Sequence, residues 1–338
     1  MKICICGGGN LGHVIAGFVA AQGKYEVNIL TQHPEKWEQD LIIEAPEGTT
    51  YLGHINGLFS DAEQAVSDSD IILLCLPGYA IRNTLLQIKD FLMPSAAVGS
   101  VVSSTGFFFQ ALELLPQEQV LFGFQRVPFI SRVIEYGHRA RLMGYKDSLN
   151  LAVEHTVHPE PLREVLTDML HTPITLLGSY YEASLSNSNP LLHPSRLYSL
   201  WKDWHEGIVY PHVPLFYEEW TEETAQIYID MDNELQTLLN ILPVRKGSIA
   251  TVLDYYESTD ATSLAQKLRS IEAFKGIKAP MKEIKGGFVP DFQSRYFTED
   301  FPFGLAFVYH LTHERGIPSP TIDLIYNWGM SKLNRYSQ

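Results

Sequence analysis

The chain has 338 residues, of which 45% are hydrophobic and 19% charged, and its formal net charge is −14. This is ordinary globular composition, and the length suggests two domains. The acidic balance argues against a nucleic-acid partner and requires a locally placed arginine or lysine for any anionic substrate. No run of 18 apolar residues exists and the N-terminal apolar run is too short for a secretory signal. We therefore expect a cytoplasmic protein without a membrane span.

The first predicted element is a short apolar strand, Lys2–Cys6, which leads directly into the glycine-rich stretch Gly7–Gly12. The spacing is G-x-G-x-x-G, a helical pattern follows it, and Tyr25–Leu30 has the pattern of a second strand. In such a unit the glycines allow a tight turn, close approach of a pyrophosphate and close helix packing, while the helix N-terminus faces the phosphates. Another glycine-rich α/β turn is the less favoured interpretation. The expected dinucleotide contacts are Gly7, Gly9, Asn10, Leu11 and Gly12.

The end of the second strand indicates which dinucleotide is bound. Enzymes that use NAD carry an acidic residue about 20 residues after the glycines, where it bonds the ribose 2′-hydroxyl. Here the chain has Leu30-Thr31-Gln32-His33, with Lys36 nearby and no carboxylate at the strand end. Thr31, His33 and Lys36 can accept a 2′-phosphate, so NADP is favoured over NAD, although arginine, the usual phosphate ligand, is missing.

The stretch Asp70–Gly78 is the strongest strand signal, a continuous apolar run typical of a parallel strand buried on both faces. Ligands of doubly wound sheets lie at the carboxyl ends of strands, so Leu76 and Pro77 should border the cofactor. A helix is predicted at Pro161–Leu170. Further strands are predicted at Ala96–Val102, Val120–Phe124, Ala140–Tyr145 and Ile174–Leu177. The pattern predicts an α/β Rossmann-type domain with a doubly wound parallel sheet over residues 1–178.

Three cysteines, Cys4, Cys6 and Cys75, fit no zinc-binding spacing, so we expect buried thiols and no metal site. Arg126 follows a predicted strand, and its guanidinium can hold a carboxylate through two parallel hydrogen bonds. Taken alone, Arg126 is more readily interpreted as an ordinary surface arginine.

Strand signals nearly vanish after Tyr180, so residues 179–338 are predicted to form an all-α domain. The long helices are expected at Glu222–Leu242, at Ser263–Phe274 and in a last helix that runs to about Leu333. Aromatic residues are dense between Arg196 and Trp220, which is typical of core packing, although Trp201 can instead wall a substrate pocket. A long apolar helix face fits packing in a core and packing in a homodimer interface equally well, so a homodimer stays open.

His193 lies between two prolines in the stretch SNSNPLLHPSR, with Asn189 four residues before it. At this junction a histidine can face both a cofactor bound by the first half and a substrate held by the second. Further on, Glu299 and Asp300 are bracketed by aromatic residues, which suggests a partly buried loop. A buried carboxylate needs a partner, and His193 is one candidate among twelve histidines.

Together these motifs resemble the octopine/nopaline (opine) dehydrogenase family over nearly the whole chain. The resemblance rests on GGGNLG, CLPG, NPLLHP at Asn189–Pro194 and RYFTEDFPFGL at Arg295–Leu305. The glycine motif is shared by many families, whereas the last two motifs at this separation are far more specific. Members of the family couple the amino group of an amino acid to an α-keto acid and reduce the imine with NADH or NADPH.

The resemblance implies that His193 is the catalytic histidine and Asp300 the carboxylate that orients and charges it. It also implies that Asn189 and Arg295 contact substrate. Arg126 falls near the keto-acid site, where members vary, so a dicarboxylic keto acid is possible. The chemistry agrees, because a histidine with an unperturbed pKa of about 6.5 can take and give a proton near neutrality. A carboxylate on its other nitrogen fixes the tautomer.

Two other interpretations remain open. One is a different Rossmann and helical-domain dehydrogenase, such as a ketopantoate-type or 2-hydroxy-acid reductase. The ketopantoate and 6-phosphogluconate types generally rely on a catalytic lysine, and the nearest candidates, Lys202 and Lys246, have no supporting motif. The other is a non-catalytic nucleotide-binding protein, against which the presence of both His193 and Asp300 argues. The keto acid, the amino acid, the direction and the oligomeric state are not set by these patterns.

Overall fold

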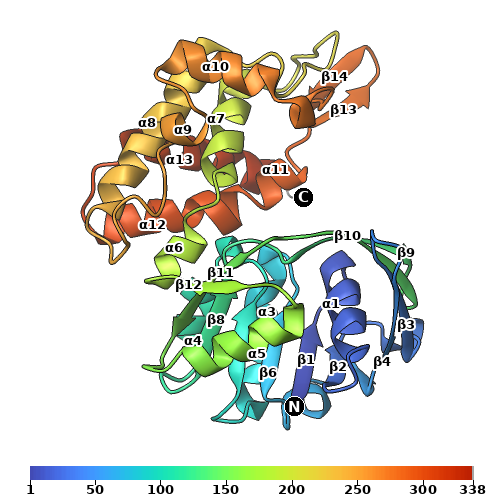
Figure 1. Ribbon diagram of the computed structural model, residues 1–338. Helices are drawn as coiled ribbons and strands as arrows, with labels where there is room; N and C mark the ends of the chain where they lie inside the picture. Colours follow the sequence, from blue (N-terminus) through green and yellow to red (C-terminus); the bar gives the residue numbers. More distant parts are fainter. Residues whose placement is uncertain (337–338) are drawn as a thin grey trace. The chain divides into compact units, whose positions relative to one another are not determined.

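The computed structural model describes residues 1–336 in two compact units, one ending at Ser186 and the other beginning at Asn187 (Figure 1). The stretch between Gly178 and Ser186, which includes the short helix α6 (Tyr180–Ser184), packs with the first unit against the strands β8 (Val120–Phe124) and β11 (Leu149–Glu154). Within the described residues, no helix is long and apolar enough to cross a membrane.

The first unit is built on an eight-stranded sheet with the order β12-β11-β8-β7-β6-β1-β2-β5. The six strands from β5 to β8 are all parallel, and their order is that of a doubly wound dinucleotide-binding fold. Beyond them, β11 runs antiparallel to β8 and pairs in parallel with β12. The remaining strands of this sheet are β1 (Lys2–Cys6), β2 (Glu26–Leu30), β5 (Gly57–Phe59), β6 (Ile71–Leu74), β7 (Ala97–Ser100) and β12 (Ile174–Leu176). The predicted doubly wound sheet is therefore confirmed.

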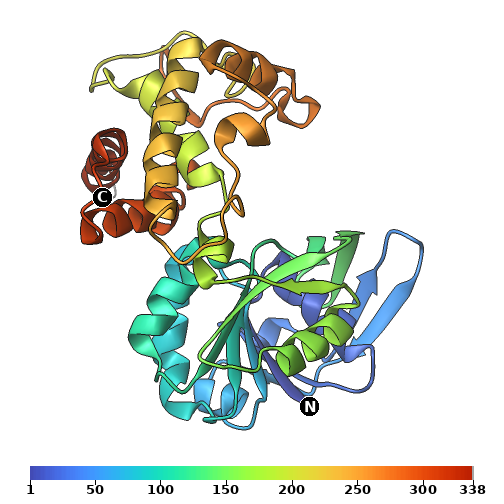
Figure 2. The same cartoon turned by 60° about the vertical axis from the view of Figure 1, so that its left-hand side comes forward.

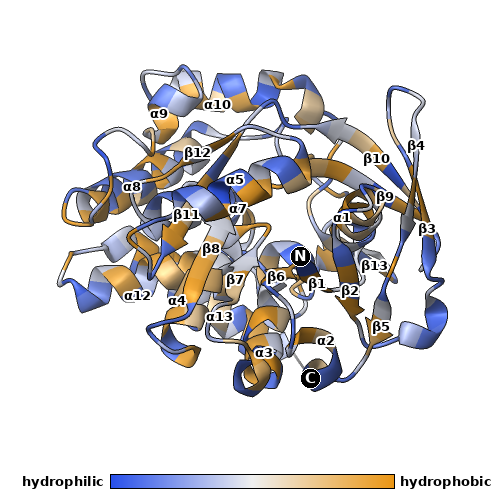
Figure 3. Ribbon diagram, turned by 60° about the horizontal axis from the view of Figure 1, so that its bottom comes forward, coloured by the Kyte–Doolittle hydropathy of each residue, from blue (hydrophilic) through white to orange (hydrophobic). Residues whose placement is uncertain are grey.

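Both faces of this sheet are buried, because its side chains alternate between two hydrophobic clusters. Ile3 and Ile5 pack toward α1 (Asn10–Ala20) and α5 (Glu160–Leu170). Cys4 and Cys6 pack toward the opposite layer, so the predicted burial of these thiols is confirmed. In Figure 3, β8 is coloured hydrophobic along its length, whereas α5 is partly hydrophilic. The layer on the Cys4 and Cys6 face consists of α2 (Ala62–Val66), α3 (Gly78–Ile88) and α4 (Phe107–Leu114).

A second sheet, with the order β4-β3-β10-β9, covers α1 and was mostly missed from sequence. Only its strand β10 (Arg139–Tyr145) was expected. Its other strands are β3 (Asp40–Glu44), β4 (Thr50–His54) and β9 (Phe129–Glu135). Glycines allow the close approach to α1, since a Cβ on Gly53 would lie 2.3 Å from the carbonyl oxygen of Gly17. These strands are short, and the alternation of apolar and polar residues along them is too weak to predict strands from sequence alone.

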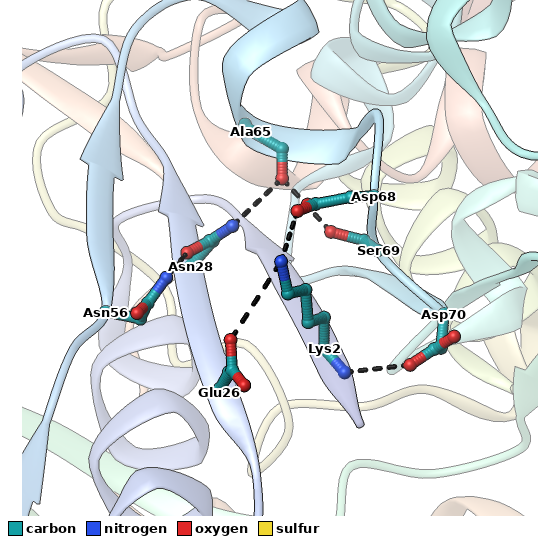
Figure 4. Close-up of polar contacts among 8 residues, drawn as sticks. All are labelled: Lys2, Glu26, Asn28, Asn56, Ala65, Asp68, Ser69 and Asp70. Atoms are coloured by element: carbon teal, nitrogen blue, oxygen red, sulfur yellow. Dashed lines mark hydrogen bonds and ion pairs between the residues drawn. The ribbon is translucent and has the colours of Figure 1, made fainter.

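The amino-terminal end of β1 carries a polar cluster, which lies at the opposite end of the strand from the glycine loop (Figure 4). The backbone N–H of Lys2 donates to Asp70 at 2.8 Å, and the Lys2 ammonium pairs with Asp68 and, at 4.0 Å, with Glu26. The buried Asn28 side chain accepts a hydrogen bond from Asn56 at 3.0 Å. Exposed ion pairs of this kind contribute little free energy, so we assign the cluster to fixing the strand end.

The second unit is mainly helical, and its longest helix is α8 (Glu222–Leu239). The side chain of Thr221 caps α8, and the helix buries residues at helical spacing. The other helices of the unit are α7 (Asn189–Trp201), α9 (Val252–Tyr255), α10 (Ala261–Ser270), α11 (Arg295–Thr298), α12 (Ala306–Glu314) and α13 (Pro320–Tyr336). Figures 1 and 2 show α8 beside α7 and α10. The predicted helical domain is confirmed, with one addition. A hairpin of β13 (Met281–Ile284) and β14 (Gly287–Pro290) makes the unit not wholly helical.

Candidate active site

His193 lies on α7, one turn after the start of the helix, and prolines flank this position on both sides. Pro190 falls in the first turn, where a missing N–H leaves no bond unmade. Pro194 lies inside the helix, so the N–H that would bond the carbonyl of Pro190 is absent. Asn189 is exposed and four residues before His193, which places both on the same side of the helix.

Asp300 reaches His193 from a second element, a short π-helix over Phe301–Leu305 that follows α11. The carbonyl of Asp300 accepts the N–H of Leu305 at 2.7 Å, a widened turn of the kind often found at functional sites. Gly304 permits close packing on α7, since a Cβ there would lie 2.8 Å from Cγ of Pro190. This approach brings the carboxylate to the face of α7 that carries His193.

The expected contact between His193 and Asp300 is present in the structure. His193 Nδ1 lies 2.7 Å from Oδ2 of Asp300, and the two side chains are 11% and 18% exposed. Because the carboxylate only accepts, Nδ1 carries the proton that it bonds, and Nε2 is the nitrogen left for exchange. The ring of Tyr296 meets the imidazole edge-on, with the centroids 4.7 Å apart. The geometry is that of a histidine whose tautomer is fixed by a carboxylate.

Two residues of this site were not singled out from sequence. The hydroxyl of Tyr217 lies 2.9 Å from His193 Nε2. Arg196, three residues after His193, is buried and donates to the backbone carbonyls of Phe216 at 2.9 Å and Leu215 at 3.3 Å. Tyr217 was one member of a dense aromatic set, and nothing in its sequence context separates it from residues that only fill the core.

The predicted substrate residues of the second unit fall into two groups. The side chain of Arg295 is 88% exposed and lies 3.8 Å from Glu299, so its guanidinium is accessible to a ligand. Asn189 is also exposed. Trp201, in contrast, is 1% exposed and stacks with the ring of Phe297 in the core. Its burial corrects the prediction of a substrate contact in favour of core packing.

Arg126 lies in the first unit, just beyond the carboxyl end of β8. Its guanidinium is exposed and donates a hydrogen bond to the carbonyl of Ser186 at 3.2 Å. This contact uses one N–H group of the guanidinium and leaves its other N–H groups for a carboxylate.

A cavity of about 430 Å³ opens at the carboxyl ends of β1 and β6, where the strand order reverses. Ligands of doubly wound sheets bind at this switch point. Six of the nine predicted cofactor residues line the cavity: Gly7, Gly9, Thr31, His33, Leu76 and Pro77.

The glycine loop fits a dinucleotide for reasons of space. Gly7 has φ of +121°, and a Cβ on it would lie 2.6 Å from the carbonyl oxygen of Cys75. A Cβ on Gly12 would lie 2.0 Å from the carbonyl oxygen of Gly7, so only glycine lets α1 start this close to β1. Gly9 has open space around it and precedes α1, whose N-terminus favours a phosphate.

The other three predicted residues, Asn10, Leu11 and Gly12, are not among those that line the cavity. Asn10 accepts the N–H of Val133 at 2.8 Å, and Leu11 packs against the hydrophobic cluster on the α1 face of the sheet. Asn10 and Leu11 thus hold the loop to β9 and to the sheet, and their contact with the cofactor, like that of Gly12, stays a prediction.

The turn between β9 and β10 adds a residue to the cavity that the sequence did not indicate. Tyr136, from that turn, is one of its lining residues. The turn is held by His13 of α1, whose Nε2 accepts the N–H of Gly137 at 2.7 Å and whose Nδ1 bonds the carbonyl of Gly9 at 2.9 Å. The imidazole also stacks on Trp37. One buried histidine thus connects the glycine loop to the second sheet.

At the end of β2, Thr31 is buried and His33 is exposed. Glu35 lies beside them, with its carboxylate 3.1 Å from His33 Nδ1. Glu35 comes five residues after the strand end, beyond the position where the motif predicts an acidic residue. Lys36, the third expected phosphate ligand, is not a lining residue of the cavity.

Other kinds of site find no support in the described part of the chain. No group of three or more metal-ligating side chains is present among residues 1–336. Lys202, one candidate for a catalytic lysine, is in an ion pair with Glu223 at 2.7 Å.

Comparisons with known proteins match the chain from end to end. Residues 176–333 match the family described as NAD/NADP octopine/nopaline dehydrogenase, alpha-helical domain, and residues 2–103 match the family described as NADP oxidoreductase coenzyme F420-dependent. An opine dehydrogenase from Haliotis discus hannai is 29% identical over 99% of this chain and 91% of its own length. A tauropine dehydrogenase from Arabella iricolor is 28% identical, with 98% and 91% covered.

Among solved structures, an octopine dehydrogenase with NADH and L-arginine superposes with a TM-score of 0.87 at 26% identity. The match covers 99% of this chain and 90% of that one. The helical-domain match, the full-length relatives and this structural likeness agree with the motifs around His193 and Asp300. The chain is therefore similar to the opine dehydrogenases over nearly its whole length, and its helical unit matches the helical domain of the octopine/nopaline dehydrogenases.

Proposed function

We propose that the protein is an opine dehydrogenase that joins the amino group of an amino acid to an α-keto acid and reduces the product with NADPH or NADH. The reverse reaction is included. The observation that carries this proposal is the pair of His193 and Asp300, with Nδ1 and Oδ2 2.7 Å apart, in a chain similar to opine, octopine and tauropine dehydrogenases over nearly its full length.

In this reaction His193 acts as the acid and base. It takes a proton from the incoming amine and returns one to the hydroxyl that leaves as water. Asp300 holds the proton on Nδ1, so that Nε2 is the nitrogen that exchanges protons, and it stabilises the imidazolium. The dinucleotide, when bound, supplies the hydride that reduces the imine. General acid and base help of this kind contributes about 10²- to 10⁴-fold in rate.

Anionic substrates need cationic anchors in a chain with a net charge of −14. We assign Arg295 and Asn189 to substrate binding, because both are exposed: Arg295 begins α11, five residues before Asp300, and Asn189 lies on α7 with His193. Arg126 is assigned to the keto acid, since its guanidinium retains free donors at a strand end. A dicarboxylic keto acid would use two such anchors.

The division of labour that we propose follows the chain. Residues 1–178 bind the dinucleotide and contribute Arg126 to the keto acid, and residues 179–338 supply the other substrate contacts. The glycine loop and the cavity at the switch point support the first assignment. The exposed Arg295 and Asn189, together with the pair of His193 and Asp300, support the second.

NADP is the favoured dinucleotide, because His33 lines the cavity and has Nε2 available for a 2′-phosphate. Glu35 is the argument for NAD, since a ribose 2′-hydroxyl would suit its carboxylate. Titration of the protein with each dinucleotide separates the two. His33→Ala should weaken NADPH binding and leave NADH binding unchanged, and an equal effect on both would remove His33 from the phosphate site.

The experiment that tests the function measures oxidation of NADPH and of NADH with a grid of substrates. Pyruvate, oxaloacetate and 2-oxoglutarate are each combined with a panel of amino acids that includes arginine and taurine, and each substrate is also assayed alone. Turnover that requires both partners supports an opine dehydrogenase and identifies the pair. Turnover with a keto acid alone would replace the proposal with a 2-hydroxy-acid dehydrogenase.

A cytoplasmic location and a homodimer remain part of the proposal. The three cysteines are free and buried, as suits a reducing compartment. Sedimentation of the purified chain tests the homodimer, and a sedimentation coefficient of a monomer at assay concentration would exclude it.

A further inference from the structure

Both ring nitrogens of His193 already have partners within the second unit. Nδ1 bonds Asp300, and Nε2 lies 2.9 Å from the hydroxyl of Tyr217. A histidine that exchanges protons with a substrate needs either a free nitrogen or a neighbour that passes the proton on. Tyr217 is therefore either displaced by the substrate or part of the proton path.

The side chain of Tyr217 has little room to move. It is 4% exposed, and its ring stacks on Phe274 with centroids 4.1 Å apart and an angle of 17° between the planes. The ring of Trp220 is parallel to it at 6.2 Å. Rotation of the phenol away from His193 would break these contacts, so displacement by substrate is the costlier route.

The backbone that carries Tyr217 is tied to the helix that carries His193. Arg196 of α7 donates to the carbonyls of Phe216 and Leu215, the two residues just before Tyr217. Burial lowers the pKa of Arg196 to about 10, so the guanidinium is still charged near neutral pH and keeps both donors. One helix thus positions the imidazole and, through Arg196, the phenol.

We propose that Tyr217 relays the proton between His193 and the substrate, an inference that rests on the proposed function. The relevant step is the loss of water from the adduct of amine and keto acid. The phenol O–H gives its proton to the hydroxyl that leaves, while the imidazolium Nε2–H gives its own to the phenol oxygen. The C–O bond breaks, the lone pair of the nitrogen forms C=N, and water departs.

Protons and electrons balance in this step. The phenol ends as it began, His193 is left neutral, and Asp300 retains its bond to Nδ1–H. Because the two transfers occur together, no phenolate forms. Burial, above all, raises the pKa of Tyr217, which keeps the hydroxyl protonated between turnovers. The cationic imine is then ready for a hydride and needs no further proton.

The test begins with the wild-type holoenzyme and the substrate pair found by the grid assay. Turnover is measured in mixtures of H₂O and D₂O. In a relay two protons move in the same step, so a plot of the turnover rate against the deuterium fraction of the solvent should be curved. A straight line, as for a single transferred proton, would overturn the relay without any change to the chain.

Tyr217→Phe keeps the ring and removes the hydroxyl. We expect kcat to fall about 10²- to 10⁴-fold while KM stays within a few-fold, and the residual rate to depend linearly on deuterium. Tyr228→Phe is the matched control, since Tyr228 is likewise a buried tyrosine and its ring contacts Trp220. This control should turn over like the wild type.

Failure of the relay and failure of the proposed function give different results. Full activity of Tyr217→Phe, with loss of activity in His193→Ala, would overturn the relay and leave the opine reaction in place. A wild type that is silent across the whole grid, while it still binds NADPH, would overturn the proposed function and the relay with it.

Discussion

At the scale of single residues, the hydrogen bond between Asp300 and His193 predicts that catalysis depends on the charge of the carboxylate and not only on its volume. Asp300→Asn keeps the volume but replaces an acceptor by an amide that can donate to Nδ1. The proton would then sit on Nε2, and the imidazole would present the wrong tautomer for taking a proton. We expect kcat to fall about 10²- to 10⁴-fold with the Kd for NADPH unchanged. Stopped-flow turnover and a fluorescence titration measure the two.

Asp300→Glu serves as the control, because it restores the acceptor on a longer side chain and should recover part of the lost rate. An Asp300→Asn enzyme that turns over at the wild-type rate would show that the carboxylate has no part in the chemistry. The sequence allowed this pair to be proposed, since both residues sit in motifs that resemble those of the opine dehydrogenases. It did not indicate Tyr217 or Arg196, whose roles depend on a backbone turn that returns to α7.

At the scale of elements, the close contact of the π-helix with α7 depends on Gly304. In Gly304→Ala the new methyl group would lie 2.8 Å from Cγ of Pro190 and would push the π-helix outward. We expect a loss of about 1–3 kcal/mol in the free energy of unfolding and a lower kcat, because Asp300 begins this segment. Chemical denaturation and turnover report the two effects.

The control for this prediction is Gly144→Ala in β10, where the added methyl group would make an ordinary contact, 3.6 Å from Ile130. Its free energy of unfolding and its kcat should stay near the wild-type values. If Gly304→Ala behaved like Gly144→Ala, the close packing at Pro190 could not be what sets the position of Asp300.

The second sheet makes a different prediction, because it is connected to the glycine loop by His13. Burial lowers the pKa of His13 in the folded chain, and its neutral ring accepts the N–H of Gly137. The unfolded chain then binds the proton more tightly than the folded one. This contribution to stability is complete above the ordinary histidine pKa of about 6.5 and is lost as pH falls toward the folded value.

Thermal unfolding between pH 8 and pH 5 measures this dependence, with His13→Gln as the comparison. We expect the wild-type Tm to drop below pH 6.5 more steeply than that of the variant. Parallel curves would remove His13 as a source of the pH dependence. The sequence could not reveal this link, because His13 lies inside the predicted helix and its partner Gly137 is 124 residues away.

At the scale of the whole molecule, the order of the central strands was predictable and the second sheet was not. The runs around Ile3 and Leu73 are long enough in apolar character to be read as buried parallel strands. The strands β3, β4 and β9 are buried only on the face that meets α1, so their alternation is short and mixed with charges. The helical unit was predictable from periodicity, although its hairpin was not.

The two units each have their own hydrophobic core, and we expect them to unfold in separate steps. The first buries two clusters on the faces of its sheet, and the second buries rings such as Trp201, Phe297 and Phe301. NADPH, whose proposed site lies in the first unit, should stabilise that unit by about 2.7 kcal/mol at 100 times its Kd. Calorimetry should then show one transition that moves with NADPH and one that does not.

A variant of the second unit identifies the other transition. In Gly329→Ala a methyl group would lie 1.9 Å from the ring of Phe301, which is fully buried, so the core around α13 must shift. This change should lower the transition that NADPH leaves in place and spare the one that NADPH raises. A single transition that responds to both the ligand and the variant would mean instead that the chain unfolds as one cooperative body. The stability that the cofactor confers would then extend to the helices that hold His193 and Asp300. Dinucleotide binding and substrate binding would then depend on a single cooperative unfolding transition.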